Sequence, residues 1–186
     1  MKKKRYTHLF FDLDNTLWDF KKNSHCALSS VFNFYKLSKQ NIDFNHFFEV
    51  YSAINKSLWE DYREKKITKK NLIEIRFQKT FDELKIVGID ACKFNQQYLE
   101  EMPKQNVLID GAASLLQYLK EKGYKMQIIT NGFKEVQQKK LKVTQIDNYF
   151  SKVFVSEVIE APKPDAKIFE YALKSSNAPK KSSLMI

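Results

Sequence analysis

An apolar run that ends in two carboxylates constrains the fold more than any other feature of the sequence. The run spans residues 8–13, its apolar side chains occupy both alternating positions, and Asp12 and Asp14 stand at its end. A strand that is apolar on both faces is typical of a parallel sheet covered by helices on both sides. Ligands bind at the carboxyl ends of such strands, so we expect both carboxylates to face the ligand crevice.

The residues after this run favour a loop that approaches an anion. Asn15 and Thr16 supply turn chemistry, a hydroxyl group and backbone N–H groups. One carboxylate of the pair Asp12 and Asp14 can attack a substrate while the other transfers protons. The same residues are also compatible with a plain polar turn behind a buried strand.

The sequence predicts only helices over residues 18–106. Apolar residues recur at helical spacing in four stretches, at 28–35, 44–58, 72–84 and 91–99. Ser24 and Thr68 are candidate N-caps of the first and third helices. No strand pattern interrupts these stretches, so we expect an all-helical cap domain that is inserted directly after the first strand.

Strand and helix patterns alternate in the rest of the chain. An alternating pattern resumes at 107–109, and strands are predicted at 125–130, 153–155 and 183–186. Strands that alternate with helices imply right-handed crossovers and a doubly wound parallel sheet. We therefore predict an α/β protein whose Rossmann-like core comprises residues 1–17 and 107–186, with the helical cap at 18–106.

Two further segments carry groups that bind anions. Thr130, Asn131 and Gly132 place a hydroxyl, an amide and a glycine where a predicted strand gives way to a helix. Lys163 stands between two prolines, which confine its backbone to extended conformations and present its ammonium group from a defined position. A simple strand-to-helix turn also explains the first segment, and most lysines are merely solvated.

Together these segments resemble the haloacid dehalogenase superfamily of hydrolases over nearly the whole chain. The first motif of that family is similar to Asp12-Leu13-Asp14-Asn15-Thr16, the second to Thr130-Asn131-Gly132 and the third to Lys163-Pro164-Asp165. Their order, and their positions after strands, make the resemblance specific. The helical segment is similar to the cap of the branch that contains dehalogenases, phosphatases and nucleotidases.

The resemblance implies a phosphomonoesterase that works through an aspartyl-phosphate intermediate on a small phosphorylated metabolite. Asp12 would attack phosphorus, and Asp14 would protonate the leaving oxygen and later accept a proton from water. Four residues would bind the phosphoryl group, namely Thr16, Thr130, Asn131 and Gly132. Lys163 would offset its charge.

The resemblance also implies Mg²⁺, bound by the Asp12 carboxylate, the Asp14 backbone carbonyl and water. Asp14 argues against a true haloacid dehalogenase, because the first motif of those enzymes lacks an acid at this position. The family's fourth motif would begin where the sequence ends at Ile186. We therefore expect a core that is incomplete at its C-terminus, in a truncated chain or in a short form with a damaged metal site.

Several other functions are compatible with these residues. An inactive phosphate-binding fragment would keep the binding groups, and a sugar phosphomutase would share every catalytic residue. The formal net charge of +10 raises nucleic-acid binding as a further possibility. The lysines recur along almost every predicted helix without a nucleic-acid module to organise them, so we expect no nucleic-acid partner.

The cap is expected to select the substrate. Five of its residues could line a pocket for a base or a sugar, namely His46, Tyr51, Trp59, Tyr62 and Arg76. An aromatic stripe at helical spacing is more often core packing than a binding site. Trp59, Tyr62 and Arg76 also resemble residues of nucleotidases that hydrolyse pyrimidine nucleoside monophosphates.

The sequence favours a cytoplasmic protein without a membrane partner. No apolar run is long enough to span a bilayer, and the apolar stretch behind the basic tip at residues 1–5 is too short for a signal peptide. Cys26 and Cys92 are too few for a disulfide framework or a thiolate metal site. The oligomeric state is not readable from the sequence.

Overall fold

The chain forms two compact units, seen in a computed structural model that describes residues 5–186. The core unit comprises Met1–Lys22, as far as it is described, with Pro103–Ile186, and the cap unit comprises Asn23–Met102. Residues 1–4 of the predicted basic tip lie outside the described residues. Within the described range, no helix combines the length and apolar character that a bilayer span requires.

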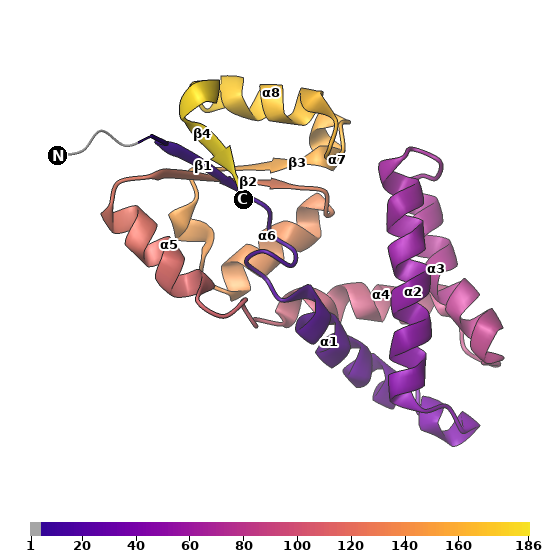
Figure 1. The fold of residues 1–186 in the computed structure, drawn as a ribbon. Coiled ribbons are helices and arrows are strands. Elements are labelled where there is room, and N and C mark those ends of the chain that lie inside the picture. The colour runs from indigo at the N-terminus through magenta and orange to yellow at the C-terminus, as the bar shows by residue number, and fades with distance from the viewer. Residues whose placement is uncertain (1–4) are drawn as a thin grey trace. The chain divides into compact units, whose positions relative to one another are not determined.

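A sheet of four parallel strands forms the centre of the core unit, in the order β3–β2–β1–β4 (Figure 1). The strands are β1 His8–Phe11, β2 Lys125–Thr130, β3 Lys152–Val155 and β4 Ser183–Met185. All four residues of β1 are buried, as expected of a strand with cover on both faces. The predicted α/β fold with a parallel sheet is confirmed.

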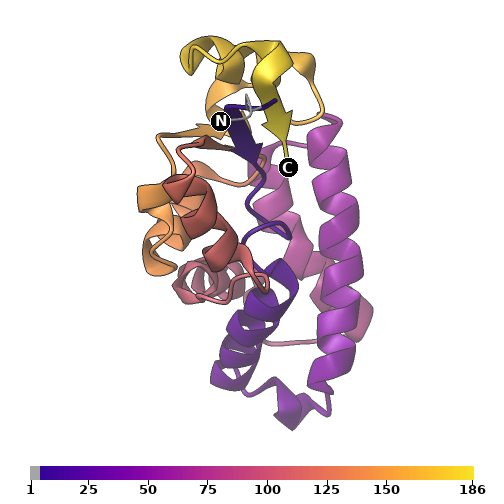
Figure 2. The same cartoon turned by 60° about the vertical axis from the view of Figure 1, so that its left-hand side comes forward.

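Helices cover both faces of this sheet, as Figure 1 and Figure 2 show from two directions. One face is covered by α8 Ala166–Ser175 and the other by α5 Ala112–Glu121 and α6 Lys134–Val143. The layer under α8 is apolar and includes Phe10, Ile129, Phe154, Ile168 and Ala172. Each buried Phe or Ile side chain of this layer contributes roughly 1.5–3 kcal/mol of hydrophobic free energy, and this burial holds the strand ends in place.

The alternating pattern at residues 107–109 forms no strand of the sheet. Leu108 forms an isolated antiparallel bridge with Trp18. Around this bridge the N–H of Asp19 donates to the carbonyl of Val107 at 3.1 Å, and the N–H of Ile109 donates to the carbonyl of Leu17 at 2.9 Å. The pairing therefore fastens the loop that follows Asp14 to the chain segment that enters α5.

Four α-helices build the cap unit, with a short 3-10 helix at Leu37–Gln40, and its described residues include no strand. They are α1 Phe20–Phe34, which begins in the core unit, α2 Phe44–Arg63, α3 Lys69–Leu84 and α4 Ala91–Glu101. Aromatic side chains fill the space between them, with the Tyr51 and Phe77 rings stacked at a centroid distance of 5.0 Å. Offset stacking of this kind adds to the energy of burial.

One of the two predicted helix caps is confirmed and the other is wrong. Thr68 caps α3 through a capping box with Asn71, in which side chain and backbone bond reciprocally. Ser24 does not cap α1, because that helix begins at Phe20 and the Asp19 carboxylate accepts the N–H of Lys22 at 3.0 Å. Ser24 is buried inside the cap unit instead.

Candidate active site

Asp12 follows β1 directly, and two donors hold one of its carboxylate oxygens. Its Oδ1 accepts the backbone N–H of Leu13 at 2.8 Å, and the Nζ of Lys163 lies 2.7 Å from the same atom. Among the described residues, no hydrogen bond or ion pair reaches Oδ2. The carboxylate is therefore held in one orientation, and the lone pairs of Oδ2 are left to accept bonds from a substrate or a metal ion.

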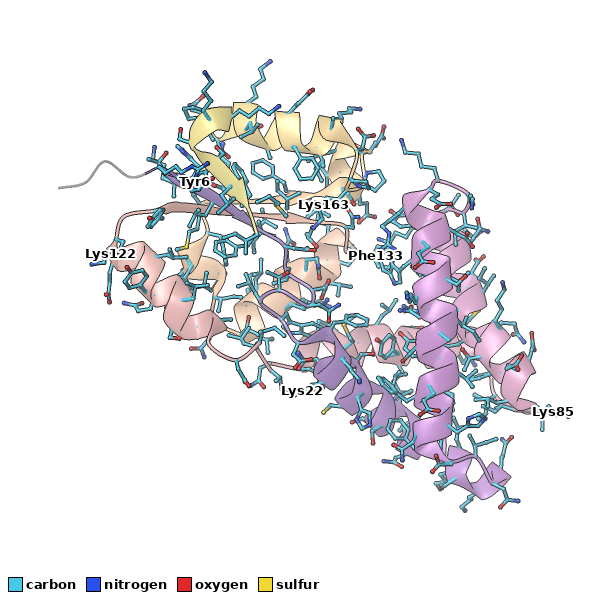
Figure 3. The ribbon with its side chains drawn as sticks, in the orientation of Figure 1. Tyr6, Lys22, Lys85, Lys122, Phe133 and Lys163 are labelled. Carbon is cyan, nitrogen blue, oxygen red and sulfur yellow. The ribbon has the colours of Figure 1, made fainter. Side chains whose placement is uncertain are left out.

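Lys163 reaches Asp12 from the loop between α7 Ser156–Ile159 and α8. Figure 3 shows its side chain beside the carboxyl end of β2. Its Nζ also donates to the carbonyl of Ile129 at 2.9 Å, and its side chain is only 15% exposed. A cation in partial burial is screened less by water than a surface cation, so its attraction for bound anions is stronger.

Asn131 ties the second motif to the third. Its Oδ1 accepts the backbone N–H of Lys163 at 2.7 Å, and its Nδ2 donates to the Lys163 carbonyl at 3.0 Å. The predicted motifs at Thr130-Asn131-Gly132 and at Lys163 therefore lie side by side. The pairing uses the Oδ1 and one of the two N–H groups of the Asn131 amide, so its second N–H and its backbone N–H could serve a ligand.

The hydroxyl of Thr130 accepts two hydrogen bonds at the end of β2. The N–H of Gly132 donates to it at 3.2 Å, and the Nε2 of Gln137 donates at 2.7 Å. A hydroxyl accepts two hydrogen bonds and donates one. Thr130 therefore has its own O–H left as a donor, whereas the N–H of Gly132 is engaged within the loop.

Two side chains of α6 hold the Asp14 carboxylate. The Nζ of Lys140 lies 2.6 Å from Oδ1, and the Nε2 of Gln137 donates to Oδ2 at 2.8 Å. The Lys140 side chain is 2% exposed, and its ammonium group lies 4.1 Å from the centre of the Trp18 ring. Burial lowers the pKa of Lys140, and the charge of Asp14 opposes this shift.

The sequence does not single out Gln137 or Lys140. Both stand in a segment with many other lysines and glutamines, which reads as a solvated helix face. The available signal is their position, because they are one helical turn apart and next to the buried Val136 and Leu141. A polar residue in an apolar register indicates a buried polar contact.

Thr16 lies in the turn behind Asp14, apart from the network that joins the other predicted residues. Its backbone N–H donates to the carbonyl of Leu13 at 3.4 Å, and Asn15 beside it has a φ of +61°, which asparagine tolerates. Among the described residues, the hydrogen bonds around Asp12 and Asp14 do not include the Thr16 side chain.

The expected metal ligands are hard oxygen atoms in suitable surroundings. Besides the Asp12 Oδ2, the Asp14 carbonyl accepts no backbone hydrogen bond from the described residues. Mg²⁺ takes one or two carboxylates and keeps several waters, so it fits this donor set. No three His, Cys, Asp or Glu side chains within residues 5–186 group around a metal position.

The cap residues expected near a substrate do not form one cluster. Tyr51 and Arg76 are buried inside the cap unit, as core packing requires. Trp59 and Tyr62 form a half-buried edge-to-face pair at 5.5 Å, and His46 is exposed on the first turn of α2. The cap unit by itself therefore presents no assembled base-binding pocket from these five residues.

Comparisons with known proteins place this site in a family. Residues 9–186 match the model of the haloacid dehalogenase-like hydrolases. The chain is 33% identical over 182 residues to the pyrimidine 5′-nucleotidase YjjG of Escherichia coli (strain K12), a match that covers 98% of this chain and 76% of that protein. It is 33% identical over 166 residues to the pyrimidine 5′-nucleotidase PynA of Streptococcus pneumoniae (strain ATCC BAA-255 / R6), covering 89% of this chain and 68% of that protein.

Solved structures agree with the sequence comparisons. The HAD-hydrolase YfnB of Bacillus subtilis, in a crystal form bound to magnesium, superposes with a TM-score of 0.83 at 30% identity and covers 98% of this chain and 78% of its own. An L-2-haloacid dehalogenase from Xanthobacter autotrophicus shares the fold, with a TM-score of 0.69 at 13% identity over 97% of this chain and 69% of its own. The chain therefore belongs to the haloacid dehalogenase-like hydrolases, as an enzyme of their phosphatase and nucleotidase branch.

Proposed function

We propose that this protein is a Mg²⁺-dependent phosphomonoesterase that hydrolyses nucleoside monophosphates, with pyrimidine nucleotides as the preferred class. One observation carries the proposal: the Nζ of Lys163 lies 2.7 Å from the Asp12 carboxylate at the end of β1. A nucleophilic carboxylate beside a fixed cation suits attack on an anionic phosphate ester. The similarity to two pyrimidine 5′-nucleotidases supports the substrate class.

In the first step, a carboxylate oxygen of Asp12 forms a bond to phosphorus while the ester bond to the nucleoside oxygen breaks. The nucleoside oxygen is a poor leaving group, and Asp14 gives it a proton as it departs. The products of this step are the free nucleoside and an aspartyl-phosphate at Asp12. Splitting one difficult displacement into two easier steps is the advantage of covalent catalysis.

In the second step, water attacks the phosphorus of the aspartyl-phosphate. Asp14, now ionised, accepts the proton of that water, and the bond between phosphorus and the Asp12 oxygen breaks. Inorganic phosphate leaves, and both carboxyl groups return to their starting states. General acid–base catalysis of this kind accelerates a reaction by about 10²–10⁴-fold.

The other site residues stabilise charge on the phosphoryl group. The free O–H of Thr130 would donate to a phosphoryl oxygen, as would the backbone N–H of Asn131, while the N–H of Gly132 orients the Thr130 hydroxyl. Lys163 would offset the charge that the phosphate brings to Asp12. Mg²⁺ at the Asp12 carboxylate and the Asp14 carbonyl would supply further positive charge to the phosphoryl oxygens.

Phosphate release from a panel of substrates tests this proposal. The panel contains pyrimidine and purine nucleoside monophosphates, hexose phosphates and 4-nitrophenyl phosphate, with Mg²⁺ or with a chelator. We expect pyrimidine nucleotides to give the highest kcat/KM and the chelator to abolish turnover. Asp12→Asn is expected to be inactive, whereas Asp147→Asn serves as a matched control outside the site. Metal-independent hydrolysis, or hydrolysis that survives Asp12→Asn, would overturn the proposal.

A further inference from the structure

The amide of Gln137 connects the proton-transfer carboxylate with the phosphate-binding hydroxyl. Its Nε2 donates to the Oδ2 of Asp14 at 2.8 Å and to the Oγ1 of Thr130 at 2.7 Å, while its side chain is fully buried. The nitrogen of the amide faces Asp14, whose Oδ2 accepts one of its hydrogens. Both N–H groups of the amide are then used, and the direction of each bond is determined.

This direction determines how the Thr130 hydroxyl is oriented. Thr130 accepts from Gln137 and from the N–H of Gly132, so its hydrogen points away from both donors. The hydroxyl is thereby available to donate to a phosphoryl oxygen. The Gln137 amide orients this donor in addition to holding Asp14.

Lys140 restrains the other oxygen of Asp14. Its Nζ lies 2.6 Å from Oδ1, so both oxygens of the carboxylate have partners from the same helix. The Trp18 ring supports the ammonium group from a distance of 4.1 Å to its centroid. The Asp14 side chain, 26% exposed, still borders solvent.

Neither residue is the best choice for stability alone. The Oε1 of Gln137 is buried without a hydrogen-bond partner among the described residues, and Lys140 carries a cation into the interior. Both features cost free energy of folding, and apolar residues of similar volume avoid this cost. A glutamine and a lysine at these two positions therefore lower folding stability, which indicates that they are present for function.

Gly132 makes room for this arrangement. A Cβ atom added at Gly132 would lie 2.4 Å from the Nε2 of Gln137 and 2.5 Å from its Cδ. The Gln137 side chain can cross this part of the loop only because residue 132 lacks a side chain. The second motif thus accommodates the side-chain amide of Gln137 from α6 because its glycine has no side chain.

We infer that Gln137 and Lys140 are positioning residues that hold Asp14 by both carboxylate oxygens for proton transfer, and that Gln137 also orients the Thr130 hydroxyl toward the phosphoryl group. This inference rests on the proposed function and names two residues on which its proton-transfer step depends. Loss of either residue leaves Asp12 and its cation in place. It impairs proton donation to the leaving group.

The leaving group distinguishes this role from a general structural one. A nucleoside oxygen needs a proton as it departs, whereas 4-nitrophenolate departs readily without one. The value of kcat/KM reports the steps up to the release of the first product, so it isolates this proton transfer from the later attack by water. Variants with a displaced Asp14 should therefore lose more activity on a nucleotide than on the aryl ester.

The experiment compares Gln137→Met and Lys140→Met with Gln138→Met and Lys139→Met. The control positions have the same residue types on the same helix and are exposed. We expect kcat/KM for uridine 5′-monophosphate to fall about 10- to 100-fold in the two site variants. For 4-nitrophenyl phosphate it should fall less than about 3-fold in Lys140→Met. In Gln137→Met it should fall further than in Lys140→Met but less than for the nucleotide, because this variant also loses the orientation of the Thr130 hydroxyl. The control variants should match the wild type on both substrates.

A double-mutant cycle tests whether Lys140 acts through Asp14. In an Asp14→Asn background, Lys140→Met should cause no further loss of kcat/KM, because the group that Lys140 positions is already disabled. Equal losses on both substrates, or a full further loss in this background, would overturn the inference. If a methionine variant fails to fold, Gln137→Leu and Lys140→Leu replace it in the same comparison.

The outcomes separate this inference from the proposed function. Wild-type protein without Asp12-dependent hydrolysis would refute the proposed function, and the inference would fall with it. Wild-type protein with Asp12-dependent hydrolysis, whose site variants behave as the α6 controls do, would refute the inference alone.

Discussion

Asn131 and Lys163 exchange two hydrogen bonds, although 32 residues of sequence separate them. In this way the side-chain amide of Asn131 joins the loop after β2 to the loop before α8. The ammonium group of Lys163 pairs with Asp12. The two hydrogen bonds from Asn131 hold the Lys163 backbone, so they fix the position of this positive charge in the site.

Removal of the Asn131 amide should loosen Lys163 and lower stability. For Asn131→Ala we expect the free energy of unfolding to fall by about 1–3 kcal/mol, the net value of two partly buried hydrogen bonds, and kcat to fall with it. Urea unfolding and steady-state kinetics provide the two measurements. Asn148→Ala, at an exposed position of the core unit, is the control. An unchanged kcat in Asn131→Ala would show that the exchange does not position Lys163.

Removal of the Lys163 ammonium group should impair turnover with little effect on folding. We expect Lys163→Met to lower kcat/KM by about 10²–10³-fold, because a preorganised charge at the phosphoryl group is lost. Lys163→Arg should recover only part of this loss, since the planar guanidinium cannot occupy the same point position. Lys167→Met, on the exposed face of α8, should have wild-type kinetics. Similar kinetics of Lys163→Met and Lys167→Met would contradict the assigned role.

A methyl group at residue 132 should act through Gln137. Gly132→Ala places an atom 2.4 Å from the Gln137 amide nitrogen, and the flexible end of that side chain has to move. We expect this variant to lose kcat/KM on nucleotides as the Gln137 variants do, with a melting temperature near that of the wild type. In a Gln137→Ala background the added methyl group meets no amide, so Gly132→Ala should there cause little further loss. Additive losses would mean that Gly132 acts independently of Gln137.

His8 should make the stability of the protein depend on pH. Burial, and in second place the charge of Lys125, lower the pKa of His8 below its ordinary value of 6.5, and its Nε2 is buried without a partner among the described residues. The unfolded chain therefore binds a proton more readily than the folded chain below about pH 6.5. The stabilisation is present above pH 6.5 and is lost as the pH falls toward the lowered pKa of the folded state.

Urea unfolding between about pH 5 and pH 8 measures this dependence. The wild type should lose stability relative to His8→Phe as the pH falls through this range. His46→Phe, at an exposed position of the cap unit, controls for histidine content. Parallel stability profiles of the wild type and His8→Phe would contradict the prediction.

The strands of the core could be predicted because burial on both faces leaves a simple apolar pattern. The same logic located Asp12 and Lys163, since residues that follow parallel strands gather at one edge of the sheet. Their contact at 2.7 Å agrees with this expectation. The alternating pattern at residues 107–109 did not correspond to a strand of the sheet, because a short apolar stretch beside Trp18 can form a single bridge without joining a sheet.

The contacts of α6 could not be predicted from local sequence. Gln137 and Lys140 resemble the exposed Gln138 and Lys139 in composition, and only packing against the sheet decides which pair is buried. Ser24 shows the same effect on the cap side. A helix that starts earlier, behind Asp19, leaves Ser24 in the helix interior rather than at a cap. Partners distant in the sequence, here Tyr98 at 2.9 Å, decide what such a residue does.

Trapping of the phosphorylated protein tests the central claim that Asp12 is the nucleophile. Enzyme in excess over uridine 5′-monophosphate is treated with borohydride, which reduces an aspartyl-phosphate, and the reduced position is located by peptide mass spectrometry. The account predicts substrate-dependent reduction at Asp12, and none in Asp12→Asn. Reduction at another residue, or steady turnover without any trapped adduct at Asp12, would contradict it.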